Sequence, residues 1–167
     1  MWNEPQLLHQ LLQKLTRVVI AYLNAQIDAG AQVVQVFDTW GALLDEKGYR
    51  EFIQPYQQQV LDGVNREKAP AVLYMNGSSR LLDAMVETSP DVISLDWMTS
   101  ISEARQRLGV DKVLQGNLDP TALLARPEVL KPMVNHLIDE GGNQNFIFNV
   151  GHGLIPPTPV ENVKLLV

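Results

Sequence analysis

The 167-residue sequence contains no cysteine, and this absence removes several kinds of chemistry at once. A disulfide scaffold, a thiolate metal site and a cysteine nucleophile are all excluded. The three histidines, His9, His136 and His152, lie far apart in the sequence. They form no H-x-x-x-H or E-x-x-H pair of the kind that binds zinc. We therefore expect a protein that uses neither a metal nor an organic cofactor.

Long hydrophobic runs and basic clusters are also missing. No apolar run approaches the roughly 18 residues of a membrane span, and the start, MWNEPQLLHQ, lacks the basic segment of a signal peptide. The formal net charge is −6, and no Lys/Arg cluster could follow a phosphate backbone. These features predict a cytoplasmic protein with no membrane or nucleic-acid partner, although a locally positive pocket could still bind an anionic small molecule.

The sequence does contain a regular alternation of helical and extended patterns. Short β-branched runs predict strands at residues 32–37, 71–74, 92–95, 112–115 and 146–150. Helical spacing predicts helices between them, the first carrying one apolar stripe of Leu7, Leu8, Leu11, Leu12, Leu15, Val18, Val19 and Tyr22. Pro55 is expected to bend or break the second helix. Capping boxes at Ser100–Glu103 and Thr158–Glu161, and an N-cap at Asp119, predict three further starts.

Alternating strands and helices predict a parallel sheet, which leaves two architectures open. One is an open, flavodoxin-like doubly wound domain. The other is a (β/α)8 TIM barrel, which takes about 250 residues when complete. The chain begins directly with a helix and stops early in its final one, so we expect residues 1–167 to form a single incomplete TIM-barrel domain of about five βα units. The inner face of its sheet is expected to carry Val33, Val36, Val72, Ile93, Leu95, Val113, Ile147 and Val150.

Small, polar or aromatic residues follow every predicted strand, where ligands bind in parallel βα folds. Thr39 and His152 are the main candidates for substrate binding, and His152 is flanked by Gly151 and Gly153, which leave the backbone open to a ligand. Further candidates for the pocket lining are Phe37, Asn76, Gly77, Asp96 and Gln115. Each also has a structural interpretation: Asp38 and Asp96 could orient loops, Thr39 could bond its own backbone, and Asn76-Gly77 could form a turn. A Ser78–His152–Asp96 triad is conceivable but lacks the G-x-S-x-G elbow.

Four segments together resemble the uroporphyrinogen decarboxylase family. They are QVFDTWG at residues 35–41, SLDW at 94–97, QGNLDP at 115–120 and FNVGHGL at 148–154. The resemblance runs from about Leu7 to the end and corresponds to the C-terminal part of the family. It implies a (β/α)8 barrel that forms a homodimer. It also implies removal of the four acetate carboxylates of uroporphyrinogen III to give coproporphyrinogen III, in haem and chlorophyll synthesis, without cofactor or metal.

The resemblance assigns Thr39 and His152 to substrate-binding positions. The family's catalytic aspartate, its carboxylate-binding arginines and its assisting tyrosine lie upstream of the matching segments, so the catalytic residues remain unknown and the chain alone is expected to be inactive. Two alternatives stay open. One is a non-catalytic barrel remnant or dimerisation partner. The other is a related zinc-dependent methyltransferase, whose H-x-C ligands would fall at Tyr74 and Asn76.

Overall fold

The computed structural model describes residues 1–166, which form an α/β fold around five strands. The strands are β1 (Val34–Asp38), β2 (Ala71–Met75), β3 (Val92–Ser94), β4 (Val113–Leu118) and β5 (Phe146–Val150). Within these residues the α-helices are α1 (Pro5–Asp28), α2 (Glu46–Phe52), α3 (Gln54–Gly63), α4 (Leu82–Glu87), α5 (Ile101–Leu108), α6 (Pro127–Gly141) and α7 (Val160–Lys164). All five predicted strands are present. β1 begins two residues later than expected, and β4 continues three residues further.

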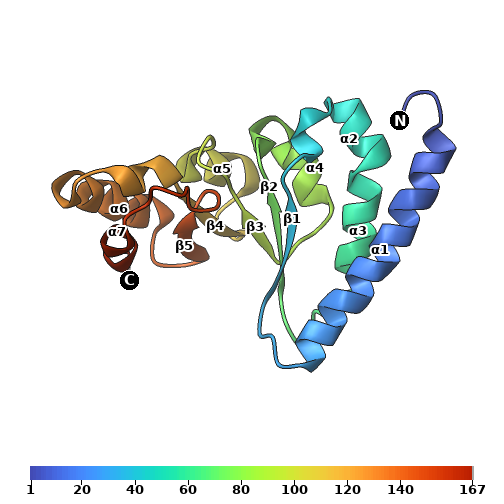
Figure 1. Ribbon diagram of the computed structural model, residues 1–167, viewed down its shortest axis with the longest axis horizontal. Coiled ribbons are helices and arrows are strands. Elements are labelled where there is room, and N and C mark those ends of the chain that lie inside the picture. Colours follow the sequence, from blue (N-terminus) through green and yellow to red (C-terminus); the bar gives the residue numbers. More distant parts are fainter. Residues whose placement is uncertain (167) are drawn as a thin grey trace.

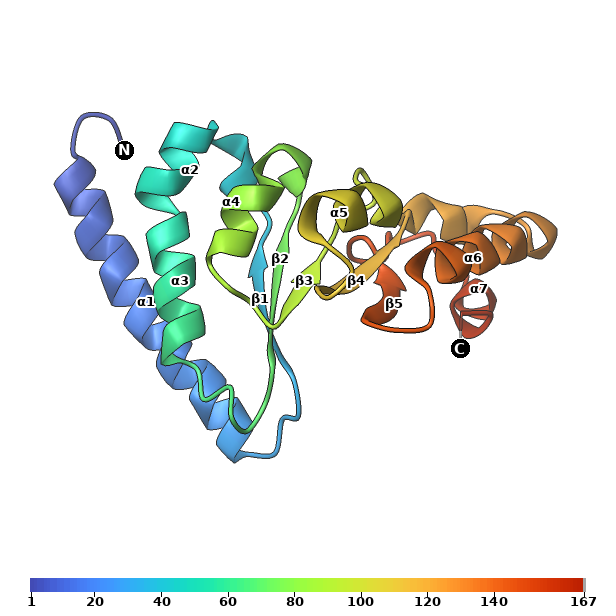
Figure 2. The same cartoon turned by 180° about the vertical axis from the view of Figure 1, so that it is seen from behind.

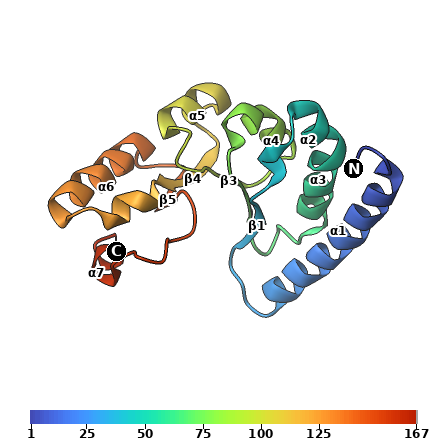
Figure 3. The same cartoon turned by 45° about the horizontal axis from the view of Figure 1, so that its top comes forward.

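The order of strands in the sheet follows their order in the sequence, and every neighbouring pair is parallel. Figure 1 and the reverse view in Figure 2 show the sheet twisting from β1 to β5. In Figure 3 helices α2 to α6 follow one another in an arc beside the strands. A flavodoxin-like sheet reverses its strand order and carries helices on both faces. The observed sequential order is instead consistent with part of a (β/α) barrel.

The two faces of the sheet pack differently. The main apolar cluster includes Leu73, Ile93 and Leu114, which occupy one register row and pack with apolar residues of the helices. The neighbouring row runs through Phe37, Tyr74, Ser94, Gln115 and Ile147, on the opposite face.

The expected inner-face list was therefore partly wrong. Ile93 and Leu95 belong to the cluster under the helices, and Val36 and Val150 pack against it. Side chains alternate between faces along a strand, so a misplaced register position moves a residue to the other face. The residue types alone did not reveal which face of the sheet each strand residue occupies, because both faces contain apolar residues.

Helix α1 buries a narrower face than its sequence predicts. Its buried residues are Thr16, Leu23 and Ile27. Most of the predicted apolar stripe is exposed, namely Leu7, Leu11, Leu15, Val18, Val19 and Tyr22. Contacts to α3 hold the helix, including a hydrogen bond from Gln13 Nε2 to Gln59 Oε1 of 2.9 Å. None of the helices within residues 1–166 has the length and hydropathy needed to cross a membrane.

Local signals placed most helix boundaries correctly. The Ser100 hydroxyl accepts a hydrogen bond from Glu103 N at 3.0 Å, and Asp119 Oδ1 accepts one from Thr121 N at 2.8 Å. The break expected at Pro55 is confirmed, because α2 ends at Phe52 and α3 begins at Gln54. The prediction of a second capping box is wrong: α7 begins at Val160, and the buried Thr158 hydroxyl has no hydrogen-bond partner within residues 1–166. Pro159 takes the N-cap position instead.

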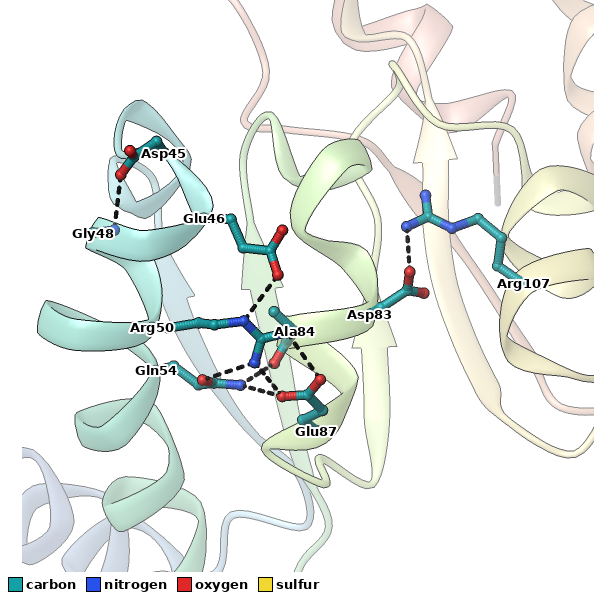
Figure 4. Close-up of polar contacts among 9 residues, drawn as sticks. All are labelled: Asp45, Glu46, Gly48, Arg50, Gln54, Asp83, Ala84, Glu87 and Arg107. Carbon is teal, nitrogen blue, oxygen red and sulfur yellow. Dashed lines mark hydrogen bonds and ion pairs between the residues drawn. The ribbon is translucent and has the colours of Figure 1, made fainter.

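Ion pairs link neighbouring helices on the outside of the fold (Figure 4). Arg50 of α2 donates two hydrogen bonds to Glu87 of α4, at 2.5 and 3.0 Å. Gln54 Nε2 joins them, donating to Glu87 Oε2 at 2.9 Å and to the Ala84 carbonyl at 2.7 Å. Hydrogen bonds from Arg50 and then Gln54 lower the pKa of Glu87 from 4.5 to about 2. The folded state therefore favours the charged form of Glu87.

This shift predicts a specific acid sensitivity. The contribution of Glu87 to stability is present above a pH of about 4.5 and is lost as the pH falls toward about 2. Glu87→Gln should flatten the dependence of the urea midpoint on pH in that interval, measured for both proteins at the same protein concentration. The effect should shrink in 1 M salt, because the pair is exposed. Glu161→Gln, which removes a separate ion pair with Lys164, is the control. Equal pH slopes for wild type and Glu87→Gln would contradict the prediction.

Candidate functional site

A cavity of about 360 Å³ opens near the carboxyl ends of the strands. It is lined by Gln35, Phe37, Tyr74, Ser94, Asn149, Val150, His152 and Gly153. Phe37, Tyr74 and Ser94 occupy one register row across β1, β2 and β3, so the pleat points all three side chains to the same face. The cavity therefore combines an aromatic wall with a few polar groups, as small-molecule sites commonly do.

His152 lies over this row in the loop after β5. Its Nδ1 atom is 2.9 Å from the Tyr74 hydroxyl, and its ring stacks on Tyr74 at a centroid distance of 5.8 Å. The Trp97 ring lies beside the same imidazole, at a centroid distance of 6.1 Å and an interplanar angle of 35°. The loop depends on glycine at position 151, where an added Cβ would come within 2.5 Å of Trp97 N. Close backbone packing thus places the histidine at the cavity.

Tyr74 is almost fully buried and also donates to the Gly151 carbonyl at 2.9 Å. Burial, with a smaller contribution from the charge of Asp96, raises the pKa of Tyr74 to about 12. The phenol therefore keeps its proton at neutral pH. It can hold the loop backbone and the imidazole at the same time.

Asp96 follows β3 and has no exposed surface. Its carboxylate accepts hydrogen bonds from the backbone N–H groups of Gly77, Ser78 and Met98, the last at 2.8 Å. The Asn117 side chain donates to the Asp96 carbonyl at 2.6 Å. Asp96 thus connects the loops after β2 and β3. This is the loop-orienting role that the sequence left open, and Asp96 does not line the cavity.

Asp38 has a similar role in the loop after β1. Its carboxylate accepts hydrogen bonds from Gly41 N at 2.7 Å and Gln57 Nε2 at 2.8 Å. The buried Tyr49 hydroxyl donates to Gln57 Oε1 at 2.6 Å. This relay fixes the turn that carries Thr39, whose side chain is half-buried and is not part of the cavity lining.

The remaining candidates lie beside the cavity rather than on its surface. Gln115 is buried within β4 and donates to Gln35 Oε1 at 3.1 Å and Ser94 Oγ at 2.9 Å. Asn76 and Gly77 form the turn after β2, where Gly77 has a φ of 72°. That left-handed conformation favours glycine.

The structure therefore brings Phe37 and His152 together and leaves Thr39, Asn76, Gly77, Asp96 and Gln115 outside the lining. The site candidates did not include six other residues that line the cavity, namely Gln35, Tyr74, Ser94, Asn149, Val150 and Gly153. A period-of-two count along β1 and β2 could have found Gln35 and Tyr74, because both precede a strand end on the face of Phe37.

Ser78, His152 and Asp96 do not form a catalytic triad. The Ser78 hydroxyl is buried with no hydrogen-bond partner within residues 1–166. The Asp96 carboxylate binds backbone N–H groups, and His152 Nδ1 meets Tyr74. Within the same residues, no group of three or more His, Asp or Glu side chains is placed to hold a metal ion.

Comparison with known proteins gives a consistent assignment. The family model described as uroporphyrinogen decarboxylase (URO-D) matches residues 1–167. Proteins named uroporphyrinogen decarboxylase are 40% identical in Pelobacter propionicus, 42% in Geotalea daltonii and 44% in Hamiltonella defensa. The alignments cover 100%, 97% and 100% of this chain, but only 49%, 48% and 48% of the relatives. The chain thus spans about half the length of these relatives, and it belongs to the uroporphyrinogen decarboxylase family.

Proposed function

We propose that this chain supplies the C-terminal part of an enzyme that decarboxylates uroporphyrinogen III to coproporphyrinogen III, and that it is inactive alone. The family match over the whole chain carries this proposal. The position of His152 on a cavity at the strand ends supports it. Residues 1–167 would form one incomplete barrel domain, in line with the single five-strand sheet. The complete protein would act as a homodimer, as the family resemblance implies.

The reaction is one that a protein can perform without a cofactor. An electron-rich pyrrole ring is protonated at the carbon next to the one that bears the acetate arm, which places positive charge on the arm-bearing carbon. The electron pair of the breaking C–CO2 bond then forms a double bond between the CH2 group of the arm and that carbon. Protonation of this exocyclic CH2 group and loss of the proton first added to the ring leave a methyl group on a restored pyrrole. The protein must orient the macrocycle and stabilise positive charge in the ring. In this chain we assign His152 and Thr39 to the acidic arms of the substrate, and Phe37 to the apolar wall beside the ring.

The proposal is tested by completing the barrel. The chain should be fused to the part of the Pelobacter propionicus relative that it does not cover, and incubated with uroporphyrinogen III. Chromatography of the oxidised porphyrins should show the four-carboxylate product from the fusion and none from the chain alone. A folded fusion that binds no substrate and forms no product would overturn the proposal. Turnover by the chain alone would refute its inactivity.

His152→Ala in that fusion should lower kcat/KM roughly 10- to 150-fold. This corresponds to about 1.5–3 kcal/mol for a charge-assisted hydrogen bond to one carboxylate. The melting temperature should change little, because the side chain is exposed and lies between two glycines. His136→Ala, at an exposed position on α6, is the matched control. A large fall in melting temperature with unchanged kinetics would show that His152 serves folding instead.

We expect the fusion to contain no stoichiometric zinc. The positions where related methyltransferases carry H-x-C ligands hold Tyr74 and Asn76, and neither side chain is a good zinc ligand. Elemental analysis after dialysis against metal-free buffer should give far less than one zinc per chain. One tightly held zinc per chain would contradict this prediction and favour methyl-transfer chemistry.

A further inference from the structure

The Tyr74 hydroxyl has two strong partners but only one proton to donate. The Gly151 carbonyl oxygen and His152 Nδ1 each lie 2.9 Å from it, and Asn76 Oδ1 lies at the longer distance of 3.5 Å. A carbonyl oxygen can only accept a hydrogen bond, whereas a neutral imidazole nitrogen either donates or accepts. The direction of these bonds therefore decides which nitrogen of His152 carries the proton.

The buried carbonyl settles that direction. Gly151 is buried, and within residues 1–166 its oxygen receives no hydrogen bond other than that from Tyr74. If Tyr74 donated to His152 instead, this carbonyl would be left unsatisfied, which costs about 1–3 kcal/mol for a buried group. If Tyr74 donates to Gly151, its oxygen lone pairs remain free to accept a bond from His152 Nδ1–H. Only the second arrangement satisfies all three groups.

We propose that Tyr74 is a positioning residue that holds His152 in the Nδ1–H tautomer and leaves Nε2 as the nitrogen that meets a ligand in the cavity. The stacking of the two rings, with planes 14° apart, fixes the imidazole plane as well. In its neutral form His152 then offers an acceptor to the ligand through Nε2. When protonated, it offers a single N–H donor there, while Nδ1 remains bound to Tyr74.

This inference rests on the proposed function only for the identity of the ligand. A tetrapyrrole offers N–H donors at its rings and carboxylate acceptors on its arms, and Nε2 could meet either kind of group according to its protonation. Free histidine in water favours the tautomer with its proton on Nε2, so the assigned state departs from the default and is measurable without any substrate.

The test is the tautomer of His152 in the 167-residue chain, labelled with nitrogen-15 at the histidine rings. Long-range nitrogen–proton spectra at about pH 8.5, well above the ordinary histidine pKa of about 6.5, report the proton position on each ring. We expect mainly Nδ1–H for His152. If the chain self-associates, magic-angle-spinning spectra of the sedimented protein give the same reading, since they do not require rapid tumbling.

Tyr74→Phe removes the hydroxyl and keeps the ring, so the buried packing is preserved. It should shift His152 to mainly Nε2–H. Tyr56→Phe is the matched control, because Tyr56 contacts a different imidazole, that of His9, at 2.7 Å. His136 serves as an exposed internal reference in every spectrum. The control variant should leave His152 unchanged.

Two results would overturn the inference: mainly Nε2–H in the wild type, or an Nδ1–H majority that persists in folded Tyr74→Phe. The tautomer of His152 measured in the wild type tests the inference even if a variant fails to fold. The measurement uses no substrate, so it is separate from the assay of the proposed function. A wrong tautomer with an active fusion refutes only the role of Tyr74, and an inactive fusion with the expected tautomer refutes only the decarboxylase assignment.

Discussion

The 167-residue chain by itself is expected to self-associate in solution and to lack a cooperative melting transition as a monomer. β1 and β5 are the edges of the sheet, and each has a strand neighbour on one side only. Unpaired N–H and C=O groups along such edges are templates for pairing with another chain. Phe37, on β1, is 69% exposed, and the apolar stripe of α1 is open beside it.

The size of the effect follows from the apolar area. Covering about 500 Å² of apolar surface at about 25 cal/mol per Å² gains roughly 12 kcal/mol. A typical domain has a total stability of only about 5–15 kcal/mol. The free energy gained by covering these surfaces in an assembly is therefore as large as the free energy that stabilises a typical folded domain. Light scattering after gel filtration at micromolar concentration should show assemblies larger than one chain.

A triple variant locates the association. Leu11→Gln, Leu15→Gln and Val18→Gln change α1 side chains that are already 49–60% exposed, so the fold should survive and the assemblies should become smaller. The matched control replaces three exposed valines elsewhere, Val110, Val129 and Val160, with glutamine. This control should change the assembly size much less. A monomeric wild type that melts cooperatively would contradict the prediction.

Asp96→Ala should destabilise the fold more than any other single loop substitution proposed above. It removes the acceptor for three backbone N–H groups, at Gly77, Ser78 and Met98. An unsatisfied buried donor costs about 1–3 kcal/mol, so a total loss of roughly 3–5 kcal/mol is expected after partial rehydration.

Urea denaturation at equal protein concentration, in the background of the α1 triple variant, measures this loss. Asp139→Ala, at an exposed position on α6, should stay within about 0.5 kcal/mol of its parent. Asp96→Asn should give an intermediate loss, because one oxygen remains to accept while the new NH2 group faces donors. An Asp96→Ala midpoint equal to that of Asp139→Ala would show that the three N–H groups find water at no cost.

Local sequence signals predicted much of the fold, and the failures are informative. The strands, the break at Pro55 and the caps at Ser100 and Asp119 depend on neighbouring residues, so a short window contains the whole cause. The Thr158 capping box failed because the helix begins only after Pro159. The sequence left the role of Asp96 open for a different reason. A carboxylate after a strand can face a ligand or bond a neighbouring loop, and the choice depends on residues about twenty positions away.

The sequence alone determined the alternation of strands and helices, the parallel sheet and the family motifs, because each depends on local spacing and residue identity. Only the tertiary structure decided which face of α1 is buried, which strand residues face the cavity, and what His152 contacts. Tyr74 and His152 are 78 residues apart in the sequence. Periodicity states which side chains share a face, but packing between distant segments decides what that face meets.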